Sequence, residues 1–259
     1  MLIKEVVDAL ERFAPLPLQD GYDNAGMQVG LTEVEVTGAL LCLDVTEQII
    51  DEAVDRGCNL IVSHHPLLFH APKRYVGATY VERCVMKAIR KGVAVYSAHT
   101  NLDNARGGVS FRMAEKLGLT GVETLSAGAV DGAGAGVIGN LPAKVGAEEF
   151  LRRVKQVFGA GCVQHTEACG RMVQRVALCG GAGAFLVSEA VSKGADVFVT
   201  GEAGYHEFFG HEDQMITAVI GHYESERFTD EILYSIIHEA CPDLRLCNTA
   251  LNTNPIKYL

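Results

Sequence analysis

The stretch Leu60–Pro66, which reads LIVSHHP, decides the fold, because a short apolar run of strand length ends there in two histidines and a proline. The apolar runs at residues 93–98 and 216–220 end in a similar way, in histidine and acidic residues. In an open α/β sheet, ligands bind beyond the carboxyl ends of the strands. The three strand ends are therefore expected to converge on one site.

Outside these runs, apolar segments of strand length alternate with amphipathic segments of helical period. This alternation is typical of parallel βαβ units, so the predicted fold class is α/β. We expect strands at residues 38–45, 59–63, 93–98, 172–179, 196–200 and 215–221, and helices at 3–13, 47–56, 80–90, 110–117, 148–158, 185–193 and 226–239.

An internal repeat underlies this order. Residues 52–63 align without gaps on residues 189–200, and five of the aligned positions are identical. A histidine with an acid four residues later follows each copy, which favours a true repeat over coincidence. The repeat predicts two related α/β halves, residues 1–125 and 126–259, with a metal-binding cleft between them. The Gly- and Ala-rich stretch 127–139 is expected to form turns or a short hairpin at the boundary.

Composition limits the possible partners. The chain has 259 residues, 48% of them hydrophobic, and a net charge of −10. Without a compact basic cluster, no nucleic-acid partner is expected, and no apolar run is long enough for a membrane partner. With no secretory signal at the N-terminus, a cytoplasmic location is predicted. The eight cysteines are scattered and form no CxxC pair, so we expect reduced, mostly buried thiols.

The polar residues at the strand ends have the chemistry of metal ligands. Imidazoles and carboxylates without a thiolate are the ligand set of a divalent transition metal that serves hydrolysis. Five ligands are too many for one ion that keeps an open position, so two ions per chain are expected, of Zn, Fe, Mn, Ni or Co. The alternatives are a hydrogen-bonded histidine pair at residues 64–65, a surface His-Glu pair at 222 and 226, and an aspartate that serves a turn at 103. The predicted ligands are His64, His65, Asp103, His222 and Glu226.

Other residues have secondary roles in this prediction. Glu202 and His206 follow the strand at 196–200 and are candidates for the catalytic acid and base, with an ordinary helix start as the alternative. His99 and Asn24 are expected either to hydrogen-bond to a metal ligand without contacting the metal themselves, or to contact the substrate. Residues 180–183, GGAG, could cradle an anion, but a tight turn is favoured because the Lys of a P-loop is missing.

Several of these motifs resemble one known family. Residues 23–30, 63–69, 99–103, 200–206 and 221–226 together resemble the GTP cyclohydrolase 1 type 2 homologues, which are interacting-factor-three-like dinuclear-metal proteins. The resemblance implies two related α/β halves, a ring-shaped homohexamer and a two-metal centre on the five residues named above. Tyr22 stands where that family often has Trp, and residues 120–170 are too short to hold the inserted domain of longer relatives.

Two classes of function remain open from the sequence. The first is a metal-dependent hydrolase acting on a small molecule such as a nucleotide, a phosphoester or a cyclic amide. The second is a non-catalytic hexameric scaffold that binds metal or a metabolite. The sequence does not select between these classes, because a two-metal centre can serve the hydrolysis of several kinds of bond and so indicates no particular substrate.

Overall fold

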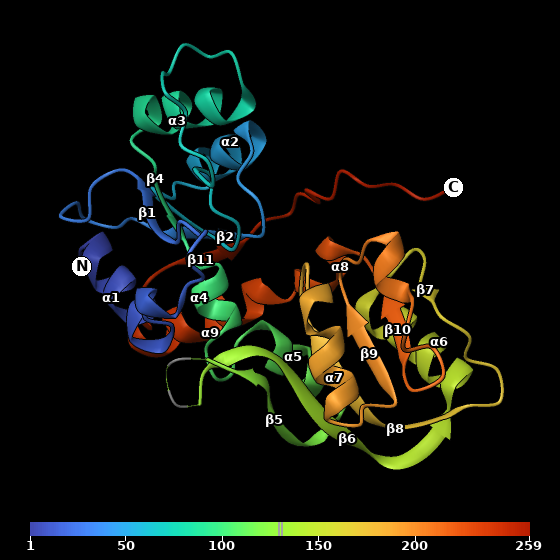
Figure 1. The fold of residues 1–259 in the computed structure, drawn as a ribbon. Coiled ribbons are helices and arrows are strands. Elements are labelled where there is room, and N and C mark those ends of the chain that lie inside the picture. Colours follow the sequence, from blue (N-terminus) through green and yellow to red (C-terminus); the bar gives the residue numbers. More distant parts are fainter. Residues whose placement is uncertain (129, 131) are drawn as a thin grey trace. The chain divides into compact units, whose positions relative to one another are not determined.

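The fold is α/β with two sheets, as expected (Figure 1). The computed structural model describes residues 1–128, 130 and 132–259. These residues form two compact units. The first contains Met1–Leu102 and Thr229–Thr253, and the second contains Asp103–Phe228 and Asn254–Leu259.

The sheet of the first unit has the strand order β1-β4-β3-β2-β11. Four of the strands are parallel, and β1 runs antiparallel to β4. Every residue of β2, β3 and β4 is buried, which explains why these strands read as continuous apolar runs. The strands are β1 (Gly26–Val29), β2 (Ala39–Cys42), β3 (Leu60–Ser63), β4 (Ala94–Ser97) and β11 (Leu246–Asn248).

Helices pack against this sheet. Leu40, Ile61 and Val95 share a core with Ile49 and Ala88, so two helices cover one face. Another helix contacts β2 and packs against the first helix of the chain. The helices are α1 (Ile3–Phe13), η1 (Leu16–Leu18), α2 (Glu47–Asp55), α3 (Tyr80–Lys91), α4 (Thr100–Asp103), whose last residue begins the second unit, and α9 (Thr229–Ala240).

The sheet of the second unit has the strand order β5-β6-β8-β9-β10-β7. Its strands β8, β9 and β10 are parallel, and the others are antiparallel to their neighbours. The short hairpin expected at residues 127–139 is part of a longer pair, β5 with β6. The strands are β5 (Thr120–Ala127), β6 (Gly134–Gly146), β7 (Gln164–His165), β8 (Met172–Cys179), β9 (Val197–Thr200) and β10 (Ile216–Val219).

The helices of the second unit cover its sheet and carry part of the candidate site. Phe150, Val154 and Phe158 of one helix pack on Val176 and Ile216 in the core. The helix expected at residues 226–239 is α9, which begins at Thr229, while Glu226 is the last residue of the short helix α8. The helices are α5 (Val109–Lys116), α6 (Ala147–Phe158), η2 (Ala184–Leu186), α7 (Val187–Ser192), η3 (Tyr205–Phe208) and α8 (His222–Glu226).

The two units do not coincide with the sequence halves 1–125 and 126–259. The segment that carries α9 and β11 returns to the first unit, because β11 pairs with β2 and α9 packs against α1. In the other direction, α5 and β5 belong to the second unit, where β5 pairs with β6. In each unit an antiparallel strand borders a set of parallel strands, β1 beside four in the first unit and β7 beside three in the second.

The fold bears on what was expected of the cysteines and of membrane-spanning segments. All eight cysteines are free thiols, and five of them are buried. Burial raises the pKa of Cys58 and of Cys84 to about 11, so both stay protonated at neutral pH. In the described part of the chain, none of the helices has the length and apolar character needed to cross a membrane.

Candidate metal centre

In the first unit, His64 and His65 follow directly after β3. The backbone N–H of His64 still donates to Cys42 O at 3.2 Å, and that of His65 donates to Leu43 O at 2.9 Å. The regular strand ends at Ser63, so the two rings need not point to opposite faces. Their ring centroids lie 5.0 Å apart.

The buried His64 has a fixed tautomer. Its Nδ1 lies 2.8 Å from the carbonyl oxygen of Ala98, just past the end of β4. A carbonyl oxygen can only accept, so Nδ1 carries the proton and donates it. The Nε2 atom is then the nitrogen with a lone pair, which is the atom that a metal requires.

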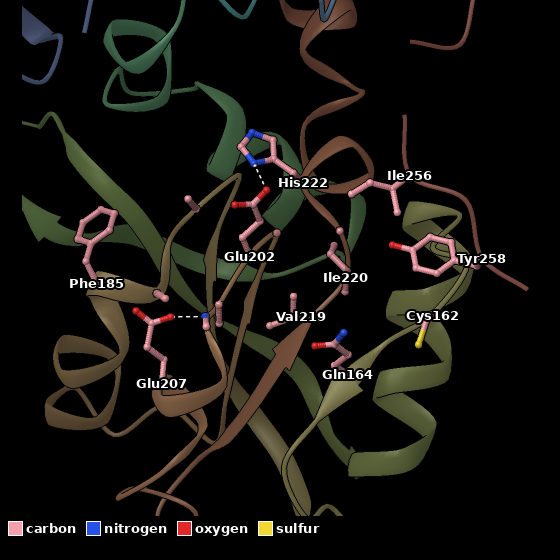
Figure 2. A pocket seen from close by; sticks show the side chains of 16 residues that line it. Cys162, Gln164, Phe185, Glu202, Glu207, Val219, Ile220, His222, Ile256 and Tyr258 are labelled. Atoms are coloured by element: carbon pink, nitrogen blue, oxygen red, sulfur yellow. Dashed lines mark hydrogen bonds and ion pairs between the residues drawn. The ribbon is translucent and has the colours of Figure 1, made fainter. Parts of the chain in front are cut away.

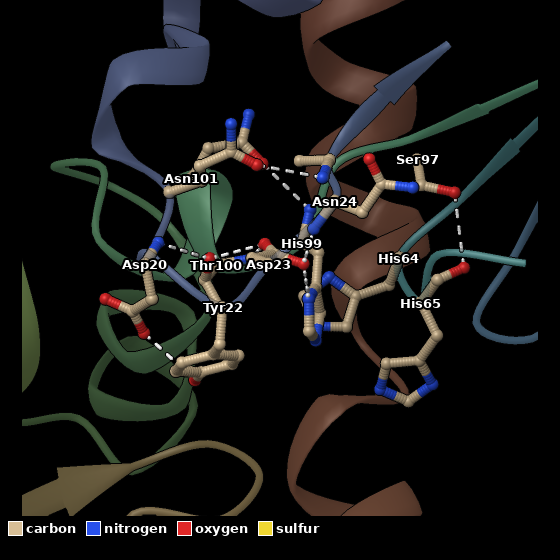
Figure 3. A network of polar contacts seen from close by, with 12 residues as sticks. Asp20, Tyr22, Asp23, Asn24, His64, His65, Ser97, His99, Thr100 and Asn101 are labelled. Atoms are coloured by element: carbon tan, nitrogen blue, oxygen red, sulfur yellow. Dashed lines mark hydrogen bonds and ion pairs between the residues drawn. The ribbon is translucent and has the colours of Figure 1, made fainter. Parts of the chain in front are cut away.

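Carboxylates fix two more imidazoles in the same way, and Figure 3 shows one of them, His99 with Asp23. The Nδ1 of His65 lies 2.7 Å from Asp44 Oδ1, and the Nδ1 of His99 lies 2.7 Å from Asp23 Oδ1. Each aspartate has a second contact on its other oxygen, from the hydroxyl of Thr253 to Asp44 and from Thr100 to Asp23. Both imidazoles are therefore oriented with Nε2 as the ligand atom.

The two aspartates are suited to this role because they stay ionised. Burial by itself would raise the pKa of Asp23, but the hydrogen bonds from His99 and Thr100 lower it to about 2. Burial likewise opposes ionisation of Asp44, and the hydrogen bond from His65 lowers its pKa below the ordinary value. An ionised partner increases the basicity of the opposite imidazole nitrogen, which strengthens a metal bond.

His99 lies closer to the pair than its expected outer position. Its ring centroid is 5.2 Å from that of His64 and 5.5 Å from that of His65. One nitrogen of each of the three histidines lies within 4.8 Å of the others. The first unit thus carries a three-imidazole cluster, His64, His65 and His99, which we call the histidine cluster.

The second unit carries a carboxylate-rich cluster around α8. His222 Nε2 lies 2.9 Å from Glu226 Oε2, as the spacing of four residues on one helical face predicts. A carboxylate oxygen of Asp103 lies within 4.8 Å of one of Glu226. The Nδ1 of His222 lies 2.9 Å from Glu202 Oε1. We call Asp103, His222 and Glu226 the carboxylate cluster.

Glycines set the position of α8. A Cβ atom added to Gly201, directly after β9, would lie 2.5 Å from Ser225 Oγ and 3.0 Å from His222 Cα. Gly221 precedes α8 with a φ of 103°, which side chains rarely adopt. The close approach of these backbones holds His222 at the end of the parallel strands.

The remaining predicted residues have different positions. Glu202 contacts His222, whereas His206 lies exposed in η3 against the rings of Tyr205 and Phe209, at centroid distances of 5.3 and 6.5 Å. The amide of Asn24 donates to Leu68 O at 2.8 Å, which ties the N-terminal loop to the segment after His65.

The glycine-rich stretch 180–183 forms a turn, as favoured from the sequence. The amide of Gly180 donates to Ser110 Oγ at 3.3 Å, and that of Gly181 donates to Ser225 Oγ at 3.0 Å. Gly183 N donates to Thr200 Oγ1 at 3.0 Å. These amides hold the chain together, so the stretch is not an anion cradle.

Sequence reasoning missed the two aspartates that orient the histidines. Asp44 directly follows the apolar run 39–43, so the rule that polar residues at strand ends point into a site would have found it. Asp23 entered the prediction only as the first residue of the motif at residues 23–30, which carries the family resemblance. Its partner His99 lies 76 residues further along the chain, and no local pattern indicates that pairing.

The donor set fits a divalent transition metal. Imidazole nitrogens with a fixed tautomer and carboxylate oxygens are ligands that Zn, Fe, Mn, Ni and Co share. No cysteine contributes to either cluster, which is consistent with a site for hydrolysis rather than a closed structural zinc site.

Comparisons with known proteins show the family of this chain. Residues 1–255 match the model of a family described as Duf34/NIF3 (NGG1p interacting factor 3). A Clostridium perfringens protein named GTP cyclohydrolase 1 type 2 homolog is 32% identical and covers 87% of this chain and 87% of its own. A Clostridium acetobutylicum protein of the same name is 33% identical over 86% of this chain and 85% of its own.

Solved structures show the same fold. A hypothetical protein of Staphylococcus aureus has a TM-score of 0.94 at 25% identity and covers 100% of this chain and 99% of its own. A Bacillus cereus protein related to NIF3 has a TM-score of 0.91 at 23% identity, over 100% of this chain and 99% of its own.

Proposed function

Because this chain belongs to the Duf34/NIF3 (NGG1p interacting factor 3) family, we propose that it is a metal-dependent hydrolase with a dinuclear centre. The substrate is a small molecule, from the class of nucleotides, phosphoesters or cyclic amides. The proposed ligands of the two ions are His64, His65, Asp103, His222 and Glu226.

One observation supports metal binding above the others. Three histidines of the first unit have Nδ1 engaged by a carbonyl or carboxylate oxygen, and one ring nitrogen of each lies within 4.8 Å of those of the other two. Histidines in an ordinary core need no shared orientation of this kind. Imidazoles that are oriented through Nδ1 and lie close together are the arrangement that metal-binding histidines adopt.

The proposal combines the histidine cluster and the carboxylate cluster into one centre. It places them in a cleft between two related halves, following the repeated pattern of a histidine with an acid four residues later. Five ligands divided between two ions leave open positions for water and substrate. The proposed assembly is a homohexamer, which rests on the family resemblance alone.

Bound divalent ions supply Lewis acidity, which lowers the pKa of a water and polarises the bond to be hydrolysed. The chain itself orients the ligands through Asp44, Asp23 and the Ala98 carbonyl. Glu202 holds the His222 ring through Nδ1 and lies where a proton can be exchanged with a reacting group. His206 stays a candidate for the second proton-transfer group.

The test is turnover by the metal-loaded protein on a panel of phosphoesters, nucleotides and cyclic amides. We expect hydrolysis of at least one compound, loss of it after chelation, and recovery when Zn, Mn, Fe, Ni or Co is added back. His65→Ala should be inactive under all conditions. If the intact protein binds metal but turns over nothing on the panel, the hydrolase proposal is wrong, and the metal-binding scaffold becomes the better account.

A further inference from the structure

The second unit contains a pocket of about 670 Å³ beside the carboxylate cluster (Figure 2). All 16 residues that line it belong to this unit. Glu202 and His222 line it, together with residues at the carboxyl ends of β9 and β10. Its volume is in the range of sites that hold metabolite-sized molecules.

The walls of this pocket are mostly apolar. Val219 and Ile220 continue from β10 into the pocket, and Phe185 borders it with 67% of its surface exposed. Ile256 and Tyr258 contribute the facing wall (Figure 2). An exposed aromatic ring at the mouth of an apolar pocket favours a planar ligand, because a flat ring can stack on it.

The charged side chains that line the pocket are acidic, and its side-chain donors belong to Gln164, His222 and Tyr258. Two carboxylates, Glu202 and Glu207, and the amide of Gln164 lie on its lining, and the lining residues that the structure describes include no Lys or Arg. The nearby backbone amides already have partners: Glu202 N donates to Gly181 O at 2.9 Å, and Gly204 N donates to the Glu207 carboxylate. A phosphate or carboxylate would lie near two carboxylates here, and no Lys or Arg lines the pocket to offset that repulsion.

The pocket is closed on one side by the segment Asn254–Leu259. Asn254 and Glu224 are both buried, and the Asn254 amide donates to Glu224 Oε1 at 3.0 Å, which anchors this segment to α8. The Tyr258 ring packs on Gly161, where an added Cβ would lie 2.4 Å from Tyr258 Cδ2. Only a glycine at position 161 leaves room for this ring, so the contact with Gly161 defines the position of Tyr258.

We infer that this pocket binds an uncharged or cationic nitrogen heterocycle that carries N–H donors, with Glu207 accepting from those donors and Tyr258 forming an apolar wall. That this ligand is the substrate rests on the proposed function, since the pocket borders His222 and Glu202. Glu207 keeps the Gly204 amide on one oxygen and presents the other acceptor positions of its carboxylate to the ligand.

Binding of three small probes to the full chain tests this inference. The probes are 2-aminopyrimidin-4-one, which presents adjacent N–H donors, pyrimidin-4-one, which lacks the amino group, and pyrimidine-4-carboxylate, which is an anion. Titration followed by NMR, with and without added Zn²⁺, measures each Kd. We expect the amino compound to bind at least about tenfold more tightly than the other two probes. The Glu207 carboxylate forms fewer hydrogen bonds with pyrimidin-4-one and with pyrimidine-4-carboxylate, because neither carries the amino group.

Variants locate the binding site. Glu207→Gln keeps an acceptor for the Gly204 amide and should weaken the amino compound about tenfold, whereas Glu149→Gln on the exposed face of α6 should not change its Kd. Tyr258→Ala should weaken all three probes, with the exposed Leu259→Ala as its matched control.

Different results separate the two proposals. Equal binding of the anion and the amino compound, or unchanged binding by Glu207→Gln and Tyr258→Ala, would overturn the pocket inference even if the protein is an active hydrolase. If the protein binds the amino compound selectively but hydrolyses nothing, the inference about the pocket ligand is supported and the hydrolase proposal is wrong.

Discussion

At the scale of single residues, the main finding is that carboxylates orient the histidines. Asp44 and Asp23 hold His65 and His99 through Nδ1, and both are ionised. The histidines themselves could be predicted from their places after strand ends. Their partners could not be found as pairs, because these lie 21 and 76 residues away and meet only in the folded chain.

The first prediction concerns Asp44. Replacing it by Asn keeps an acceptor for His65 but removes the charge, so the basicity of Nε2 falls. We expect the affinity for Zn²⁺ to decrease roughly 10- to 100-fold. Competition with a chromophoric chelator measures this affinity. The exposed Asp55→Asn in α2 is the control and should bind Zn²⁺ like the wild type. If both variants bind Zn²⁺ with equal affinity, Asp44 does not contribute to the metal site.

The second prediction separates Glu202 from His206. Glu202→Ala removes the acceptor of His222 Nδ1 and should weaken metal binding on the order of tenfold, whereas the exposed His206→Asn should leave it unchanged. Metal content after dialysis against a weak chelator is the measurement. If His206→Asn loses metal as well, His206 acts on the centre by a route that its contacts with Tyr205 and Phe209 do not explain.

At the scale of elements, the strands were the most predictable part. The buried runs that became β3, β4, β8, β9 and β10 lie within two residues of their expected bounds, because their continuous apolar character leaves little choice. Thr46 caps α2 as its sequence predicts, with Ile49 N donating to its hydroxyl at 3.3 Å. The helix expected at residues 226–239 begins three residues later, at Thr229, because residues 222–226 form a separate short helix.

The third prediction tests the backbone approach that positions α8. A methyl group at Gly201 would lie 2.5 Å from Ser225 Oγ and 2.7 Å from Gly181 O. We expect Gly201→Ala to lower the free energy of unfolding by about 1–3 kcal/mol and to weaken metal binding by moving His222. Gly146→Ala is the control, because nothing lies within 4 Å of its added Cβ. Its loss should stay under about 1 kcal/mol. Urea unfolding gives both values, and equal losses would contradict the steric argument.

At the scale of the whole molecule, the sequence predicted the class of fold but not the grouping of its elements. The return of β11 to β2 depends on a strand of three residues, which is too short to give a periodic signal. The two-half repeat and its division at residue 125 stay predictions about ancestry and symmetry. The compact units follow from pairing, and pairing joins residues 39–42 to residues 246–248.

The fourth prediction is that stability does not depend on disulfides. All eight cysteines are free, and the cores of both units are built from buried aliphatic and aromatic side chains. The melting temperature should be the same with and without reductant to within about 2 °C, since no crosslink constrains the unfolded chain. A large decrease in the presence of reductant, measured by calorimetry, would contradict this.

The measurement that tests the central claim most directly is the metal content of the purified protein and of one variant from each unit. Elemental analysis should give about two transition-metal ions per wild-type chain. His65→Ala in the histidine cluster and Glu226→Ala in the carboxylate cluster should each hold fewer ions while circular dichroism shows that they are folded. If both folded variants retain the full metal content of the wild type, these residues do not form a metal centre and the account is wrong.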